Sequence, residues 1–152
     1  MEKVAVNIVN LRDEPQYICQ YVDLRNANKE LLLSGDVGVD ETAWWLKESG
    51  AHVLIATEND ELVGAVVVYL QKDAETAIFC KYKRRGIATA LLNEAKKTVQ
   101  TMYLWAWVAD ENAASRGMFL KNGFYEAQKK LKPYTGGTVC GSVLRYDMER
   151  AK

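Results

Sequence analysis

The sequence predicts a mixed α/β fold in which four helices surround one central sheet of about seven strands. Three observations favour it. Short apolar segments typical of strands recur along the chain, other segments have apolar residues at helical spacing, and only two prolines interrupt the pattern. The 152 residues are enough for one ordinary hydrophobic core, so we expect residues 1–152 to form a single domain.

The chain begins with a strand and two helices. Residues 3–11 have apolar side chains at alternating positions, as a strand does. Residues 14–33 have apolar residues on or near one helical face, and the segment Ser34-Gly35-Asp36 ends that helix. A second, shorter helix is expected to begin with Asp40 as its cap and to end near Gly50.

Three strands follow in the middle of the chain. Residues 52–57 form the first, and His52 simply opens it. The polar segment 58–61 is a turn into residues 62–71, a strongly apolar second strand of the same hairpin. Residues 74–80 are expected to form the third strand.

The second half of the chain alternates helices and strands. Ile87 starts an apolar stripe at four-residue spacing, and Gly123 is a suitable residue for closing the second of the two helices. The predicted elements are helix 86–100, strand 102–108, helix 112–122 and strands 124–131 and 138–148. The complete order is therefore β-αα-βββ-α-β-α-ββ.

The composition excludes several classes of protein. Lys and Arg total 20 and Asp and Glu total 20, so the strong basic excess typical of nucleic-acid binding is absent. No apolar run reaches the roughly 18 residues of a membrane span, and the first 20 residues lack a signal-peptide core. We therefore expect a cytoplasmic protein with no nucleic-acid or membrane partner. The sequence leaves a homodimer open.

The cysteines and the single histidine argue against metal and triad chemistry. Cys19, Cys80 and Cys140 are few and widely spaced, so they predict small core residues rather than disulfides or a zinc site. A Ser-His-Asp triad would have to use His52, and no nucleophile-elbow motif accompanies it. We expect no metal.

One segment has the properties of an anion-binding site. The predicted strand ends at Cys80, cationic residues follow through Arg85, and a helix begins at Gly86. A helix N-terminus presents unpaired N–H groups and a partial positive charge, and Gly86 and Ala88 leave room for a phosphate. A solvated basic turn before an ordinary helix is the alternative interpretation. The spacing is neither that of a Walker A loop nor that of a dinucleotide fingerprint.

A second segment begins at Asn112 and ends at Gly123-Phe124. Asn112 is a good helix N-cap, and capping alone would explain its presence. Together, however, the two segments resemble the GNAT acetyltransferase superfamily. The acyl-CoA motif of that family, Gln/Arg-x-x-Gly-x-Gly/Ala, is similar to residues 83–88, with Lys83 in place of Gln or Arg. Asn112, Ser115 and Gly123-Phe124 match the later pattern, and the element order matches over nearly the whole chain.

The resemblance implies a binding site for acetyl-CoA as cosubstrate. The strand ending at Cys80 would splay from strand 102–108, and the pantetheine arm would pair with the exposed backbone. The pyrophosphate would sit on the amides that follow Lys83, and a backbone N–H near Ile78 to Cys80 would polarise the thioester carbonyl. The implied cofactor-binding residues are Ile78, Phe79, Cys80, Lys83, Arg84, Arg85, Gly86, Ile87, Ala88, Thr89, Asn112 and Ser115.

The resemblance also implies direct transfer of acetyl to a primary amine in a ternary complex. Glu75 is the candidate base, and a surface carboxylate with no role is the alternative. Many members of the family have a tyrosine one turn beyond Ser115, where this chain has Phe119. Either Tyr125 or solvent would then protonate the leaving thiolate.

The acceptor is expected to be a small-molecule amine. Leu24-Arg25-Asn26 and Trp44-Trp45 resemble segments of acetyltransferases that act on nucleotide-linked amino sugars and of some that modify ribosomal proteins, although the tryptophans also suit simple packing. A protein N-terminus or lysine is the alternative acceptor. Because Phe119 cannot donate a proton, a domain that binds acyl-CoA without catalysis is a third interpretation.

Overall fold

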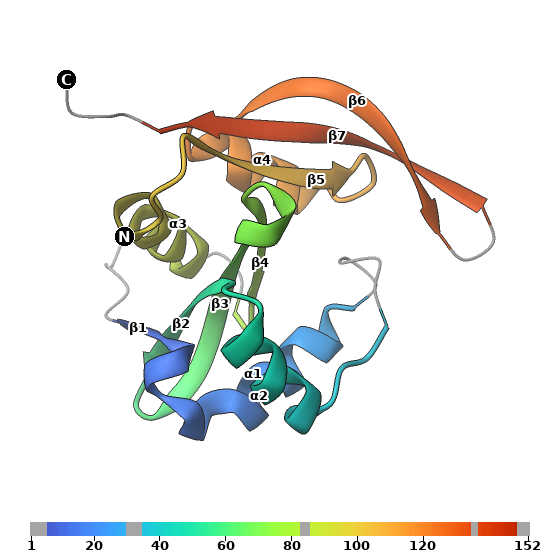
Figure 1. The fold of residues 1–152 in the computed structure, drawn as a ribbon. Helices are drawn as coiled ribbons and strands as arrows, with labels where there is room; N and C mark the ends of the chain where they lie inside the picture. The colour runs from blue at the N-terminus through green and yellow to red at the C-terminus, as the bar shows by residue number, and fades with distance from the viewer. Residues whose placement is uncertain (1–5, 30–34, 83–85, 135–136, 149–152) are drawn as a thin grey trace.

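A seven-stranded sheet forms the centre of the molecule (Figure 1). Its strands are β1 (Asn7–Asn10), β2 (His52–Glu58), β3 (Glu61–Tyr69), β4 (Glu75–Cys80), β5 (Tyr103–Ala109), β6 (Tyr125–Tyr134) and β7 (Gly137–Asp147). The structure is a computed structural model and describes residues 6–29, 35–82, 86–134 and 137–148. The strand order is β1-β2-β3-β4-β5-β7-β6, and all neighbours are antiparallel except β4 and β5. The predicted mixed sheet is confirmed.

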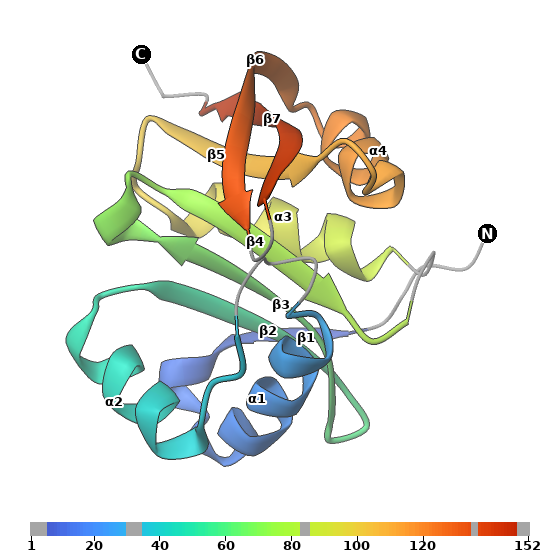
Figure 2. The ribbon, with the colours of Figure 1, turned by 90° about the vertical axis from the view of Figure 1, so that its right-hand side faces the viewer.

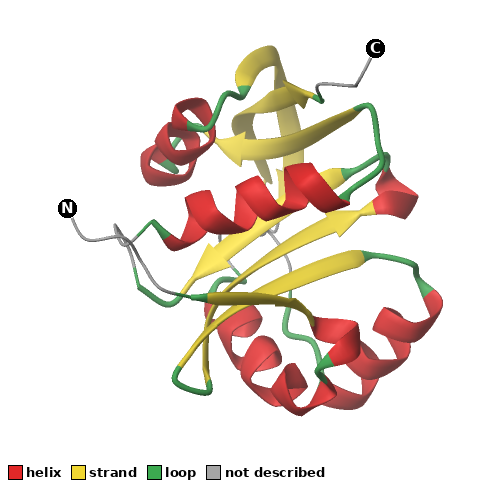
Figure 3. Ribbon diagram, turned by 90° about the vertical axis from the view of Figure 1, so that its left-hand side faces the viewer, coloured by secondary structure: helices red, strands yellow, loops and turns green. Residues whose placement is uncertain are grey.

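The four expected helices cover the two faces of this sheet. They are α1 (Ile18–Ala27), α2 (Val39–Glu48), α3 (Ile87–Thr98) and α4 (Ala113–Lys121). Figure 2 looks onto the face with α1 and α2, and Figure 3 looks onto α3 from the opposite side. Helix α4 packs beside β5. Because both faces are covered, β2 and β3 are apolar at nearly every position instead of alternating.

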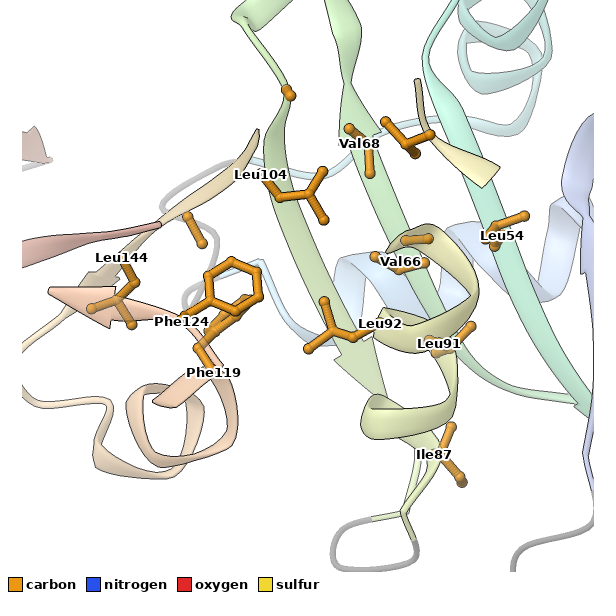
Figure 4. Packing of buried hydrophobic residues seen from close by; sticks show 14 of the residues in the cluster. Leu54, Val66, Val68, Ile87, Leu91, Leu92, Leu104, Phe119, Phe124 and Leu144 are labelled. Carbon is orange, nitrogen blue, oxygen red and sulfur yellow. The ribbon is translucent and has the colours of Figure 1, made fainter. Parts of the chain in front are cut away.

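Two hydrophobic clusters result from this arrangement. Leu54 and Val66 point to the side of α3, where they meet Leu91 and Leu92 (Figure 4). Their neighbours along the strands point the other way, to α1 and α2; they include Val53, Ile55, Ala65 and Val67. The alternation of side chains along each strand therefore fills both clusters from the same two segments.

The parallel pair β4–β5 separates soon after it begins. The only backbone register between the two strands within the described residues joins Glu75 to Trp105, whereas β5 pairs with β7 along its whole length. Beyond Glu75, the edge of β4 that faces β5 therefore has no ladder partner among the described residues. The predicted splay is confirmed, and it opens the middle of the sheet.

The first helix is shorter than the predicted 14–33. Two 3₁₀ turns, Leu11–Asp13 and Pro15–Tyr17, precede α1. Glu14 has φ −132° and ψ 63°, outside the helical region, as expected for a residue that a following proline keeps out of that region. The helix therefore starts only at Ile18. Residues 30–34, which the prediction included, lie outside the described residues.

The cap of the second helix lies two residues before the predicted one. Gly38 is the N-cap, and its N–H donates to Glu41 Oε1 at 3.2 Å. Asp40 lies inside the first turn instead, where a carboxylate is favoured by the helix dipole. The prediction that Asp40 caps this helix was therefore wrong. Gly38 occupies the cap position, and the Glu41 side chain accepts its N–H as in the reciprocal half of a capping box.

The hairpin and the opening of β2 agree with the sequence. His52 is the first residue of β2, and its Nε2 is 2.9 Å from Thr98 Oγ1. The turn between β2 and β3 places Asn59 and Asp60 at φ 51° and 63°. Two successive residues with positive φ match the twist of a tight hairpin, and Asn and Asp tolerate that conformation best after glycine.

The cysteines correct one expectation. Cys19 and Cys140 are exposed, and only Cys80 is partly buried, so two of the three are not core residues. In α1 the inward positions belong to Tyr21 and Val22, which leaves Cys19 facing solvent. Burial raises the pKa of the Cys80 thiol to about 11, so this thiol stays protonated at neutral pH.

Gly64 on β3 makes room for α3. A Cβ at this position would lie 2.8 Å from Ile87 Cγ2 and 3.2 Å from Leu91 Cδ1. Because the branched Ile87 side chain cannot easily turn away, we expect Gly64→Ala to lower the free energy of unfolding by about 1–3 kcal/mol. Urea unfolding measures this.

Gly117 in α4 provides the matched control. A Cβ there meets nothing within 4 Å, so Gly117→Ala should stabilise the protein by about 0.5–1 kcal/mol through helix propensity. Changes of opposite sign in the free energy of unfolding for the two substitutions would support the packing argument. An unchanged unfolding midpoint for Gly64→Ala would contradict it.

Candidate active site

A cavity of about 1510 Å³ lies where β4 and β5 separate. Its walls come from both strands, from α1 and α2, from the first turn of α3, from α4 and from β6. Most of the predicted site residues border it. They are Glu75, Ile78, Phe79, Cys80, Gly86, Ile87, Ala88, Thr89, Asn112 and Ser115. The predictions for Lys83, Arg84 and Arg85 lie outside the described residues.

The first turn of α3 forms one end of this cavity. Gly86 has φ 77°, a conformation that favours glycine, and it is the N-cap of the helix. Its carbonyl accepts the first helical bond, from Ala90 N at 3.0 Å. Gly86 has no side chain with which to cap the helix, so the N–H groups of the first turn are available to an anion.

Asn112 and Ser115 line the wall beside this turn. Asn112 caps α4, because its Oδ1 accepts from the Ser115 N–H at 3.2 Å. At the other end of α4, the C-cap residue Asn122 donates from Nδ2 to Thr89 Oγ1 at 3.2 Å and to the Met118 carbonyl at 2.8 Å. The bond to Thr89 joins the end of α4 to the first turn of α3.

Strand β4 forms the floor of the cavity. Ile78 pairs with Val66 on β3 and borders the cavity on its other edge. The Phe79 side chain is buried against Tyr21 of α1, with the ring centroids 5.7 Å apart. Phe79 therefore anchors the strand by its side chain, while the part of β4 that has lost contact with β5 remains accessible to a ligand.

Glu75 lies at the opposite end of β4 from the α3 turn. Its side chain is 19% exposed, and its Oε2 is 3.4 Å from Nζ of Lys132 on β6. Lys132 also lies over the Trp107 ring, 5.1 Å from the centroid. A half-buried carboxylate with one cationic partner is well placed to exchange a proton with a molecule in the cavity.

A sequence model of the Acetyltransferase (GNAT) family matches residues 20–124. The chain belongs to the GNAT acetyltransferase family. The match begins within α1, ends just before β6, and includes both of the segments that the sequence singled out. GNAT proteins are N-acetyltransferases, so this chain is an enzyme of that class.

Solved structures of GNAT proteins share the whole fold. A GNAT acetyltransferase from Streptococcus pneumoniae is 20% identical, with a TM-score of 0.79 over 95% of this chain and 100% of that chain. Spermidine N-acetyltransferase from Vibrio cholerae, solved with CoA and spermine, is 16% identical, with a TM-score of 0.79 over 94% and 95%. The protein yncA from Salmonella typhimurium, solved with its cofactor acetyl-CoA, is 16% identical, with a TM-score of 0.79 over 97% and 96%. No curated protein sequence matches.

The position at which many GNAT enzymes have a tyrosine is buried here. Phe119 borders the cavity, is 3% exposed, and packs edge-on against Phe124 with ring centroids 4.9 Å apart. It has no proton to donate. Tyr125, the first residue of β6, lies away from the cavity: it is 44% exposed, and it is absent from the described lining.

The Tyr125 hydroxyl is already engaged elsewhere. It donates to Asp147 Oδ2 at 2.8 Å, and this hydrogen bond raises the pKa of Tyr125. The structure therefore places Glu75 and the described residues predicted to bind the cofactor around one cavity, but it does not bring Tyr125 to them. A proton donor must come from another group or from solvent.

We expect Tyr125→Phe to change kcat by less than threefold, because the lost hydroxyl bonds Asp147 outside the cavity. Steady-state kinetics at saturating acetyl-CoA measures this. Phe119→Tyr is the matched reverse change, since it adds a hydroxyl at the cavity wall. A loss of about 10²-fold or more for Tyr125→Phe is the size expected for a dedicated acid and would restore Tyr125 to the mechanism.

Several wall residues of this GNAT site carry no local signal in the sequence. Lys132 lies on β6, 57 residues from Glu75, and only the sheet order brings the two together. Trp107 forms part of the wall because Gly141 leaves room for its ring and the backbone carbonyl of Lys130 accepts its indole N–H at 2.9 Å. Tyr69 and Lys72, at the end of β3, complete this part of the cavity.

The helical segments singled out for acceptor binding divide in role. Asn26 holds the segment before α2, because its side chain exchanges two 2.9 Å hydrogen bonds with the backbone of Val37. Trp45 packs on Tyr69 with ring centroids 5.8 Å apart, whereas Trp44 is 66% exposed. Because Trp45 has a ring partner and Trp44 is largely exposed, the packing interpretation suits Trp45 better than Trp44. Both tryptophans and Arg25 line the cavity.

No helix in the described ranges has the length and apolar character needed to span a membrane. Among the same residues, no three His, Cys, Asp or Glu side chains gather in a group able to hold a metal ion.

Proposed function

We propose that this enzyme transfers an acetyl group from acetyl-CoA to a primary amine of a small molecule by direct attack in a ternary complex. The observation that best supports this proposal is that one cavity is lined both by the first turn of α3 and by Glu75, at the two ends of β4. Both substrates therefore have room in the same cavity, and no covalent intermediate on the protein is needed.

The residues of the α3 end suit the cosubstrate. The amides of the turn from Gly86 to Thr89, together with the cationic residues Lys83, Arg84 and Arg85, would hold the pyrophosphate. The open edge of β4 from Ile78 to Cys80 would pair with the pantetheine arm as an added strand does. Asn112 and Ser115 would border that arm. Acetyl-CoA supplies the activated acetyl thioester.

Glu75 is the proposed general base. An amine is mostly protonated at neutral pH and must lose a proton before it can attack a thioester. Glu75 borders the cavity and has Lys132 as its partner at 3.4 Å, so the carboxylate is held in place and its charge is balanced. The proton passes from the amine to this carboxylate, directly or through water.

Solvent is the proposed source of the final proton. Phe119 has no hydroxyl, and the hydroxyl of Tyr125 is bound to Asp147. A CoA thiol that behaves like a cysteine thiol has a pKa of roughly 8.5. Such a leaving group needs little assistance near neutral pH, so an enzyme can dispense with a dedicated acid.

Thiol release from acetyl-CoA across a panel of small amines, amino sugars and N-terminal peptides tests the function. The expected result is amine-dependent release with at least one small amine, together with mass-spectrometric detection of the N-acetyl product. Transfer to peptides alone would replace the small-molecule acceptor with a protein N-terminus or lysine. Acetyl-CoA binding without transfer to any amine would leave only a binding domain.

A further inference from the structure

The charges on the half of the cavity around Glu75 are mostly positive. This acceptor half is lined by α1, α2, the end of β3 and β6, opposite the α3 turn. Among the described lining residues it contains four cationic side chains and two carboxylates, namely Arg25, Lys72, Lys130, Lys132, Glu41 and Glu75. A cavity lined in this way favours anionic groups over cationic ones.

Both carboxylates are already engaged within the protein. Glu75 lies 3.4 Å from Lys132, and Glu41 accepts the Gly38 N–H at 3.2 Å as part of the α2 cap. Neither is therefore a free counter-charge for an acceptor with several positive charges. A polyamine would bring its cations beside Arg25, Lys72 and Lys132, where like charges repel.

Two of these cations lie near Tyr69, the β3 residue that pairs with Glu75 on β4. Lys72 Nζ lies 5.4 Å from the centroid of the Tyr69 ring, and no described carboxylate pairs with it. Burial raises the pKa of Tyr69, Arg25 opposes that rise, and Glu75 adds to it, so both charges act on the same hydroxyl. Arg25 is held in position by its 2.5 Å hydrogen bond to the Gly35 carbonyl. Cationic groups thus lie next to the candidate base.

We propose that the acceptor is an amine that also carries an anionic group, a phosphate or a carboxylate, which Lys72 and Arg25 recognise. This proposal rests on the proposed acetyltransferase function and specifies its substrate class. The anion of the acceptor would lie near the end of β3, while its amine reaches Glu75. Charge complementarity then selects the acceptor and orients it.

Matched pairs of acceptors test this in the full-length protein. Glucosamine 6-phosphate is compared with glucosamine, and β-alanine with β-alaninamide, with spermidine as the cationic probe. We expect kcat/KM to favour the member that carries an anionic group over its partner without one by about tenfold or more, as the loss of a charge-assisted hydrogen bond implies. The phosphate and carboxylate arms distinguish the two anions. The preference should weaken as ionic strength rises.

Three variants locate the recognition. Lys72→Gln should reduce the anionic preference about tenfold through KM, and Lys72→Arg should retain it. Lys47→Gln, on the exposed side of α2 and outside the cavity lining, should change nothing. Because each variant is compared with the parent on the same amine, differences in amine basicity cancel.

The possible outcomes separate the two proposals. Equal or better transfer to the amines without an anionic group or to spermidine, or an anionic preference that Lys72→Gln leaves intact, would overturn the substrate class while the enzyme remains an acetyltransferase. Acetyl-CoA binding with no transfer to any of these amines or to the wider panel would instead contradict the proposed function.

Discussion

Gly86→Glu should abolish acetyl-CoA binding in a protein that still folds. The substitution places a carboxylate and its bulk at the N-cap of α3, where a phosphate would have to approach the first-turn amides. The new negative charge also occupies the site that the helix dipole makes attractive for anions. Isothermal titration calorimetry with acetyl-CoA should detect no binding at concentrations that saturate the parent protein.

Two controls separate charge from backbone strain. Gly86 has φ 77°, so any side chain there strains the backbone, and Gly86→Ala measures the effect of this strain without the added charge. Gly50 has a similar φ of 71° and nothing within 4 Å of an added Cβ, so Gly50→Glu adds the same residue outside the cavity. Both controls should still bind acetyl-CoA. Parent-like affinity of a folded Gly86→Glu protein would mean that the α3 turn is not the phosphate site.

Glu75→Gln should lower kcat/KM for the amine by about 10²–10⁴-fold at neutral pH, with acetyl-CoA affinity nearly unchanged. The amide keeps the shape of the side chain but cannot accept the proton of an ammonium group. The loss should shrink as pH rises, because more of the acceptor is then neutral before it binds. Initial rates across a pH series, with the acceptor varied, measure both effects.

The design distinguishes a base from a carboxylate that only pairs with Lys132. Lys132→Gln removes the partner at 3.4 Å but leaves the carboxylate, so it should cost much less than Glu75→Gln. Glu48→Gln, on the exposed end of α2, is the matched surface control and should have no effect. A loss that is independent of pH, or equal losses for Glu75→Gln and Lys132→Gln, would assign Glu75 a structural role.

The parts of the site that could be predicted are those in which local sequence and local structure coincide. Gly86 comes six residues after the end of β4 and directly precedes an apolar helical stripe, so its position at a helix N-terminus follows from neighbouring residues. Asn112 is an N-cap for the same reason, and its Oδ1 accepts the Ser115 N–H. Capping depends on residues three positions apart, which a sequence displays directly.

The errors came from features that depend on distant packing. A small, apolar cysteine suits a core, but Cys19 and Cys140 are exposed because other residues of α1 and β7 point inward. Tyr125 follows the late helix closely in sequence, yet its hydroxyl is bound to Asp147, 22 residues away on β7. The direction of a side chain from a strand depends on the register of its partners.

The sequence by itself determined the order of helices and strands, the family, and the α3 turn as a candidate anion site, because each rests on short-range patterns of apolar, glycine and capping residues. Only the tertiary structure decided which charges surround Glu75. The separation of β4 from β5 opens the cavity, and the sheet order then brings Lys132 of β6 to within 3.4 Å of Glu75. Contacts between residues 57 positions apart depend on how whole strands pair, and no local pattern records that choice.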